Sequence, residues 1–185
     1  YRMLASLMSG PFEDPQAGDA FMEEVVKENP DNHIAYLMRY NYRVQHFFGD
    51  RADAKADLQK ALELAPDEAD VLVKMAEMLI VDREFDAARQ HLEHGIKVHP
   101  NNEAMYIALA QLEIAIGREE EHERGEEALA ALQLGLKQMP ESVTLLSQLC
   151  ELQIRRRQFD KANDTIARLV QLDMSQEQVD FLKSR

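Results

Sequence analysis

Three histidines lie close together in the sequence and are the side chains best placed to hold a metal ion. His91 and His94 are three residues apart on a predicted helix, and His99 follows just before a proline. A zinc site needs three or four ligands in tetrahedral geometry, and no cysteine pair or carboxylate at a familiar ligand spacing joins these histidines. His122, which lies among glutamates, has no better set of neighbours. The sequence therefore predicts no metal site and no cofactor.

Cys150 is the only cysteine and the only candidate thiol nucleophile. It occupies a small-residue position that Ala76 and Ala110 fill elsewhere, which predicts a buried and inert thiol. The chain has no glycine-rich phosphate loop, and it lacks the serine-hydrolase and zinc-protease motifs. Its runs of carboxylates, such as Glu23–Glu24 and Glu119–Glu121, are typical of solvated faces in an acidic protein. We therefore predict no catalytic residues and no enzymatic activity.

The charge balance excludes some classes of partner. The chain has 21 Lys and Arg against 34 Asp and Glu, so its net charge is -13. This field repels phosphate backbones, and the compact basic run Arg155–Arg157 lies near a predicted helix end, where cations offset the helix dipole. No segment approaches the roughly 20 apolar residues of a membrane span. We predict neither nucleic-acid binding nor membrane insertion.

The single cysteine also bears on the cellular compartment. It excludes an intrachain disulfide, so the fold does not depend on an oxidising environment. We expect a cytoplasmic location. Because the chain begins at Tyr1 and not at an initiator methionine, a longer protein with its own targeting signal stays open.

Composition and proline spacing predict helices in a repeated arrangement. Only 6% of residues are aromatic, none is Trp, and Gly and Pro number 7 and 6, which favours helices joined by short turns over a sheet. Four prolines follow helical patterns at intervals of 36, 34 and 40 residues, namely Pro30, Pro66, Pro100 and Pro140. A period of 34 with insertions of two and six residues accounts for these intervals.

Each repeat unit has the apolar spacing of two helices separated by a turn. In the most regular unit, Leu72, Met75 and Leu79 lie on one helical face, and Ala88, Leu92 and Gly95 do so after a break. The predicted first helices are His33–Phe47, Ala69–Val81, Glu103–Ile116 and Val143–Arg155. The predicted second helices are Ala52–Ala65, Phe85–His99, Gly125–Met139 and Phe159–Leu172.

These features resemble the tetratricopeptide repeat family, whose 34-residue signature places a small residue and a Tyr in the first helix, Ala in the second, and Pro at the end. The resemblance implies an all-α, right-handed superhelical solenoid of antiparallel helix pairs. It divides one domain, residues 1–185, into a partial unit 1–32, full units 33–68, 69–102, 103–142 and 143–176, and a capping helix 177–185. Three residues depart from the signature where it has Tyr: Arg43, Glu113 and Gln153.

The six-residue insertion lies in Gly117–Glu127, between the helices of the third full unit. Its dense charge indicates a solvent-exposed segment. Either the neighbouring helices continue for about a turn and a half, or the segment is a loop that a partner contacts or the fold merely tolerates.

The resemblance implies that the first helices line a concave groove that binds a protein or peptide. The stripe beside the core face has four sets of three residues: Leu37, Asn41 and Val44; Val73, Glu77 and Ile80; Ile107, Gln111 and Ile114; and Ser147, Glu151 and Ile154. The walls of this stripe are apolar, and Lys74 is the one basic residue near it. The stripe therefore differs from the basic clamp with which chaperone-binding members of the family hold acidic C-termini. We predict that the groove binds an apolar or amphipathic segment, with a basic residue facing Glu77 or Glu151.

Three alternatives to this groove hypothesis stay open. The first is that part of the stripe packs against neighbouring units or the N-terminal segment. The second is that the chain is a regulatory or targeting segment of a larger enzyme whose catalytic part lies elsewhere. The third is RNA binding by related helical repeats, which the acidic charge disfavours.

Overall fold

The computed structural model describes residues 15–46, 51–119 and 125–172, and every structural statement below concerns those ranges. The structure divides into two compact units, Tyr1–Val71 and Leu72–Arg185, and each is described by itself. The predicted capping helix 177–185 lies outside the described ranges, as do residues 120–124 of the insertion. The organisation of residues 1–185 as one domain stays a prediction.

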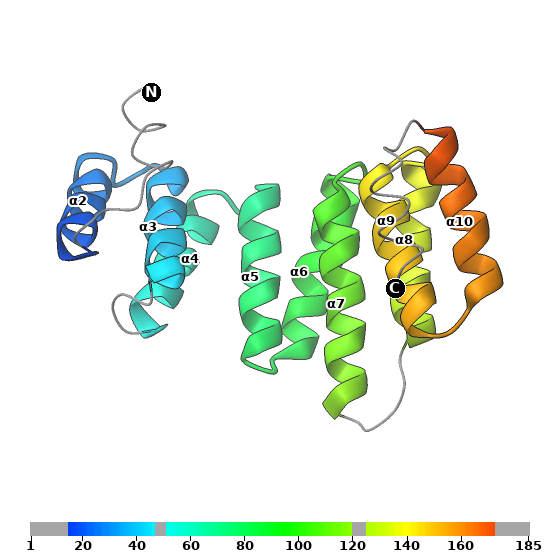
Figure 1. The fold of residues 1–185 in the computed structure, drawn as a ribbon. Coiled ribbons are helices and arrows are strands. Elements are labelled where there is room, and N and C mark those ends of the chain that lie inside the picture. The colour runs from blue at the N-terminus through cyan, green and yellow to red at the C-terminus, as the bar shows by residue number, and fades with distance from the viewer. Residues whose placement is uncertain (1–14, 47–50, 120–124, 173–185) are drawn as a thin grey trace. The chain divides into compact units, whose positions relative to one another are not determined.

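The described ranges contain helices and no strands (Figure 1). The first unit holds α2 (Pro15–Glu28), α3 (His33–His46) and α4 (Arg51–Leu64). Helix α5 (Ala69–Val81) begins at the boundary between the units. The second unit continues with α6 (Phe85–Val98), α7 (Glu103–Glu119), α8 (Gly125–Gln138), α9 (Val143–Arg155) and α10 (Phe159–Gln171). The all-α helix pairs are thus confirmed, and seven of the eight predicted helices begin at the predicted residue.

Helix α7 continues three residues beyond its predicted end at Ile116. It therefore carries the first part of the insertion, Gly117 to Glu119, as helix, while Gly125 to Glu127 form the first turn of α8. The adjoining helices thus take up both described ends of the insertion.

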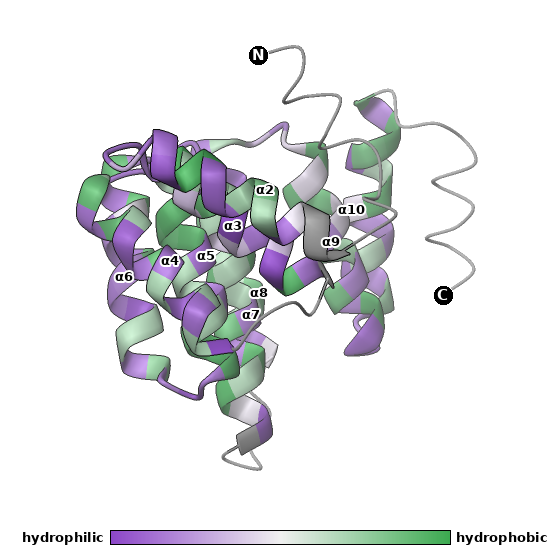
Figure 2. Ribbon diagram, turned by 90° about the vertical axis from the view of Figure 1, so that its left-hand side faces the viewer, coloured by the Kyte–Doolittle hydropathy of each residue, from purple (hydrophilic) through white to green (hydrophobic). Residues whose placement is uncertain are grey.

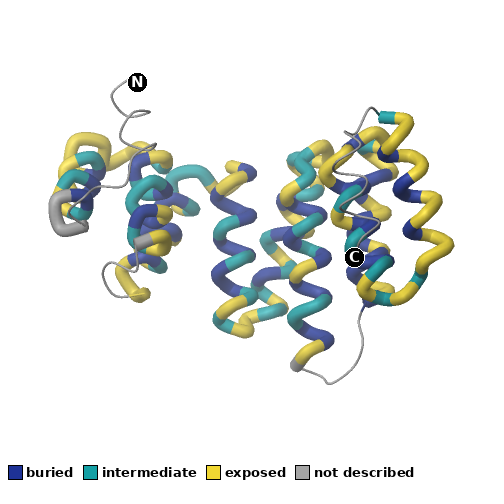
Figure 3. The backbone as a smooth tube through the Cα atoms, in the orientation of Figure 1, coloured by how far each residue is buried: buried dark blue, intermediate teal, exposed yellow. Residues whose placement is uncertain are grey.

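The helices are amphipathic, and their buried faces build the core. Hydrophobic and hydrophilic residues alternate along them in Figure 2, and Figure 3 shows buried positions recurring along α9 and α10. In the second unit the central core comes from α7 to α10, with Tyr106, Leu145 and Leu169 fully buried. The predicted burial of the small residues is confirmed, because Ala76, Ala110 and Cys150 all lie in the core.

Two turns between first and second helices share one geometry. Arg83 and Arg157 have φ values of 63° and 57°, in the left-handed region that normally favours glycine. After each of them an amide reaches back five residues, from Glu84 to the carbonyl of Leu79 and from Gln158 to that of Gln153, 2.8 and 2.9 Å long. This pattern satisfies the last carbonyls of the first helix and reverses the chain.

Side chains also tie the first helices to the prolines before them. The Tyr36 hydroxyl donates to the carbonyl oxygen of Pro30 at 3.0 Å, and the Tyr106 hydroxyl donates to that of Pro100 at 2.8 Å. In the last repeat Arg168 donates to the carbonyl oxygen of Pro140 at 2.9 Å. The turns at Pro30 and Pro100 thus anchor the helix that follows, whereas the turn at Pro140 is bonded to the second helix of its repeat, α10.

Candidate functional site

A small hollow lies between the first helices of two successive repeats, α7 and α9. Its volume is about 40 Å³. Most of its lining is apolar, with Leu132 contributed by α8, and polar side chains from both first helices join it. The lining residues are Ile107, Ala110, Gln111 and Ile114 on α7, Leu132 on α8, and Gln148, Glu151, Leu152 and Arg155 on α9.

The hollow brings together four residues of the predicted stripe, namely Ile107, Gln111, Ile114 and Glu151. The other two predicted in these helices, Ser147 and Ile154, are half-buried and do not line it. On α9 the lining lies one residue further round the helix, at Gln148, Leu152 and Arg155. In two neighbouring parallel helices, residues at equivalent repeat positions point in the same direction. A hollow between the helices is instead lined by the edge of each helix that faces the other. The lining residues of α9 are therefore shifted by one position from the equivalent residues of α7.

The other two sets of predicted residues differ in how much surface they offer. Leu37 and Val73 are buried, with 9% and 7% of their surface exposed, while Val44 is 51% exposed. Asn41 is exposed, and Glu77 and Ile80 are half-buried. Leu37 and Val73 therefore have little side-chain surface for a partner to contact. A role for these six residues in binding stays a prediction.

The carboxylates of the stripe have cations on their own helices. Lys74 contacts Glu77 at 2.8 Å, and Arg155 contacts Glu151 at 3.4 Å. Arg155 lines the hollow, so Lys74 is not the only base near the predicted stripe. Arg155 was missed in the sequence because it lies one residue past the stripe position Ile154. A partner's basic residue would have to compete with these existing contacts.

The described ranges hold no group of three His, Cys, Asp or Glu side chains arranged to bind a metal ion. Helix α6 places His91 half-buried and His94 exposed. Burial and the neighbouring His94 lower the pKa of His91. Cys150 is buried, and burial together with the Glu151 carboxylate raises the pKa of its thiol. A thiol in this state is a poor nucleophile.

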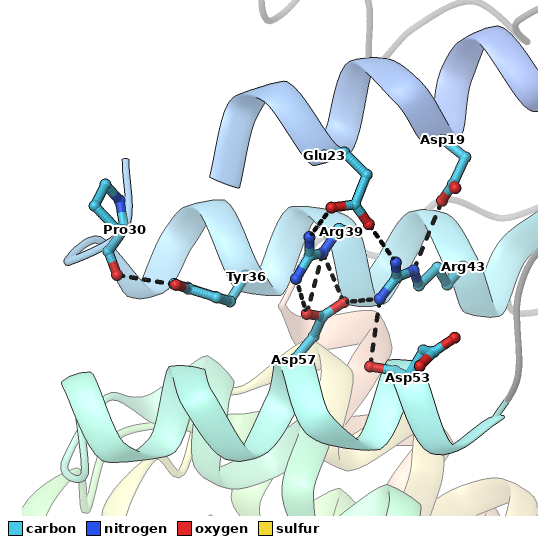
Figure 4. Close-up of polar contacts among 8 residues, drawn as sticks. All are labelled: Asp19, Glu23, Pro30, Tyr36, Arg39, Arg43, Asp53 and Asp57. Carbon is cyan, nitrogen blue, oxygen red and sulfur yellow. Dashed lines mark hydrogen bonds and ion pairs between the residues drawn. The ribbon is translucent and has the colours of Figure 1, made fainter. Parts of the chain in front are cut away.

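The three departures from the repeat signature all have polar partners. In the first unit, Arg43 contacts Asp57 at 2.8 Å and Glu23 at 2.7 Å, and Arg39 contacts the same two carboxylates at 2.5 and 2.7 Å. Figure 4 shows this closed ring of four charges, which joins α2, α3 and α4. Elsewhere Glu113 contacts Arg89, and Gln153 accepts a hydrogen bond from Thr165.

Residues 48–112 match the sequence profile of the tetratricopeptide repeat. This part of the chain therefore carries tetratricopeptide repeat sequence, in line with the helix pairs described above. Proteins of this class are generally protein-interaction scaffolds, built from stacked helix pairs. A comparison with curated proteins gives no significant match.

Solved structures with the same fold extend this comparison to most of the chain. The type IV pilus biogenesis factor PilW has a TM-score of 0.71 at 16% identity, covering 98% of this chain and 80% of PilW. PilF of Pseudomonas aeruginosa has a TM-score of 0.64 at 13% identity, covering 91% of this chain and 73% of PilF. A human IFIT1 dimer with m7Gppp-AAAA has a TM-score of 0.64 at 16% identity, covering 80% of this chain and 34% of IFIT1. At these identities the likeness shows the fold alone.

The described helices were also compared with the length and hydropathy of a membrane span. None of them is both long enough and apolar enough to cross a bilayer.

Proposed function

We propose that the hollow between α7 and α9 is the centre of a groove that binds an apolar segment of a partner protein. The observation that carries this proposal is the composition of the hollow. The half-buried Ile107 and Ile114 of α7 present aliphatic carbon to the hollow, and the buried Leu132 and Leu152 form its base. The exposed amides of Gln111 and Gln148 lie at its polar margin. An apolar centre with a polar rim is the usual anatomy of a protein interface.

The size of the hollow limits what enters it. One water molecule needs about 10–15 Å³ of such volume, so about 40 Å³ admits the end of one aliphatic side chain and excludes an aromatic ring. We therefore assign the partner segment a single aliphatic anchor here. Because Arg155 and Lys74 already contact the two stripe carboxylates, the proposal requires no basic residue in the partner.

A binding role without catalysis is supported by the state of the one cysteine. Cys150 lies in the core with a raised pKa, so its thiol meets neither solvent nor substrate as a thiolate at neutral pH. The polar residues at the hollow, two glutamines and one ion pair, include no nucleophile with an adjacent base.

The test is selection from a display library of random 12-residue peptides against the intact chain. Gln111→Trp places an indole over the hollow from an exposed position, so the fold is retained while the hollow is blocked. We expect selected peptides to share one aliphatic position and to bind this variant at least about tenfold more weakly, equivalent to about 1.4 kcal/mol.

Leu134→Glu is the matched control, because Leu134 is an exposed apolar residue of α8 that does not line the hollow. It should leave peptide affinity unchanged. Ile107→Glu, which puts a charge at a half-buried wall position, should weaken binding by more than about 1 kcal/mol, the usual mark of a central contact. Peptides that bind Gln111→Trp as tightly as the unmodified chain would disprove the groove.

A further inference from the structure

One position of the repeat carries a different residue in every first helix. It is the eleventh residue of α3, α5, α7 and α9, occupied by Arg43, Leu79, Glu113 and Gln153. Three of these side chains are polar although the position faces the interior. Only 5% of Glu113 and 4% of Gln153 is exposed. A polar residue buried in this way needs a specific partner.

Each of these residues finds a partner of matching chemistry on a second helix. The Arg43 guanidinium meets the Asp57 carboxylate at 2.8 Å, and the hydroxyl of Thr165 donates to the Gln153 amide oxygen at 2.9 Å. Asp57 and Thr165 both occupy the seventh position of the second helix, in α4 and α10. In the third repeat that position is Ala131, and Glu113 turns instead to Arg89 of α6, at 2.6 Å.

Two buried apolar positions of the second helices do not distinguish one repeat from another. The fourth residue of every second helix is a buried alanine, and the eighth is a buried leucine or isoleucine. The two sets are Ala54, Ala88, Ala128 and Ala162, and Leu58, Leu92, Leu132 and Ile166. Second helices that share these two buried contacts are not distinguished by them, although other apolar positions of these helices differ, such as Gly135 and Leu169. The two shared positions therefore do not select the correct neighbour.

We propose that the polar residues at the eleventh position select which second helix packs against each first helix. If α10 took the place of α4, Thr165 would stand where Asp57 stands, and two guanidiniums would lose their buried carboxylate. If α6 packed against α9, Arg89 would face the Gln153 amide in place of the Glu113 carboxylate. The first exchange removes the buried carboxylate of Arg39 and Arg43 and leaves them the exposed Glu23, and the second leaves the buried Glu113 without Arg89. Removing one partner of a buried ion pair is strongly unfavourable.

Selection is a different role from stabilisation. Buried ion pairs often add little net stability, because removing two charges from water offsets most of their attraction. A single buried polar residue is nevertheless enough to fix register and association state in coiled coils. The same logic predicts that removing the pairs together preserves helix formation and loses the uniqueness of helix pairing.

The test compares two variants of the full chain. The apolar variant carries Arg89→Leu with Glu113→Leu, and Gln153→Leu with Thr165→Val. The matched control exchanges one pair, Arg89→Glu with Glu113→Arg, and so keeps a complementary contact. Helicity is measured by circular dichroism, uniqueness by counting amide cross-peaks in an NMR spectrum, and association state by light scattering.

We expect the apolar variant to keep its helical signal and to show either a second set of amide resonances, about 10% or more of the total, or a larger mass. The control should show one set of resonances and the mass of the unmodified chain. The single variant Glu113→Arg, which places a second guanidinium against that of Arg89, should lose the unique spectrum, and adding Arg89→Glu should restore it.

Two results would overturn the proposal. One is an apolar variant with a single set of resonances and an unchanged mass, because the apolar surface would then suffice to select neighbours. The other is an apolar variant that loses its helical signal where the unmodified chain stays folded, because the pairs would then supply stability.

Discussion

Gly135 of α8 lies directly against the ring of Tyr106 in α7. A Cβ added at Gly135 would stand 2.8 Å from the ring carbon Cγ and 3.0 Å from Cβ of Tyr106, and 2.8 Å from a methyl carbon of Leu145. Distances under 3.0 Å are too short for carbon atoms in contact. The absence of a side chain at Gly135 therefore allows α7, α8 and α9 to approach one another.

Gly135→Ala tests this close approach. The substitution favours an isolated helix by about 1 kcal/mol, but Cβ of Tyr106 is held by the backbone and cannot move away. Overpacking of this kind typically costs about 1–3 kcal/mol, so we expect a net loss of stability in a urea titration.

Gly95→Ala is the matched comparison. Its added Cβ would meet the terminal Sδ and Cε of Met105, both at 2.6 Å, and these belong to a flexible side chain that can rotate. We expect a neutral or stabilising effect there. Equal destabilisation at both glycines would show that the rigidity of the neighbouring side chain does not decide the outcome.

The Cys150 thiol should make stability depend on alkaline pH. Burial, followed by the charge of Glu151, raises its pKa in the folded chain. The unfolded chain therefore loses the thiol proton first, at about pH 8.5. The contribution is fully present below that pH and is lost as pH rises through the folded pKa. Cys150→Ala should flatten the stability profile above about pH 8.5, as measured by urea titrations across pH. A profile that the substitution leaves unchanged would contradict the assignment.

Arg157 adopts a left-handed backbone conformation, at φ 57°, where the chain reverses after α9. A non-glycine residue in this conformation costs about 1–2 kcal/mol of folding free energy, which a glycine would recover. Glycine's greater freedom in the unfolded chain offsets about 0.5–1 kcal/mol of that stabilisation. Arg157→Gly should therefore raise the free energy of unfolding by about 0.5–1 kcal/mol. Arg157→Ala removes the same side chain and keeps the strain, so it serves as the control. Equal stability of the two variants would place the effect in the lost side chain.

Binding of single-stranded RNA should be absent even at low salt. The net charge of -13 repels a phosphate backbone, and low ionic strength leaves that repulsion unscreened. The measurement is an electrophoretic shift with an unstructured RNA at about 20 mM salt, where nonspecific cationic contacts are strongest. Any shifted band at this salt concentration would refute the prediction, and a band that persists as salt rises would indicate specific RNA contacts.

The order of helices was predictable from the sequence because two local signals agree. Apolar residues at helical spacing identify each helix, and prolines such as Pro66 and Pro100 mark where a pair ends. These signals depend on residues close in sequence. They located the starts of helices from α5 to α10, and they also placed Cys150 in the core.

The facing edges of neighbouring helices were decided by tertiary packing. The repeat register placed Ser147 and Ile154 in the groove, but the hollow is lined by Gln148, Leu152 and Arg155. A register tells which residues are equivalent, and it does not tell which edge of a helix turns toward its neighbour. The partners of Arg43, Glu113 and Gln153, the residues that depart from the repeat signature, could not be predicted for the same reason. Glu113 meets Arg89, 24 positions earlier in the chain, and only the packing of α6 against α7 brings a carboxylate and a guanidinium that far apart in sequence to 2.6 Å.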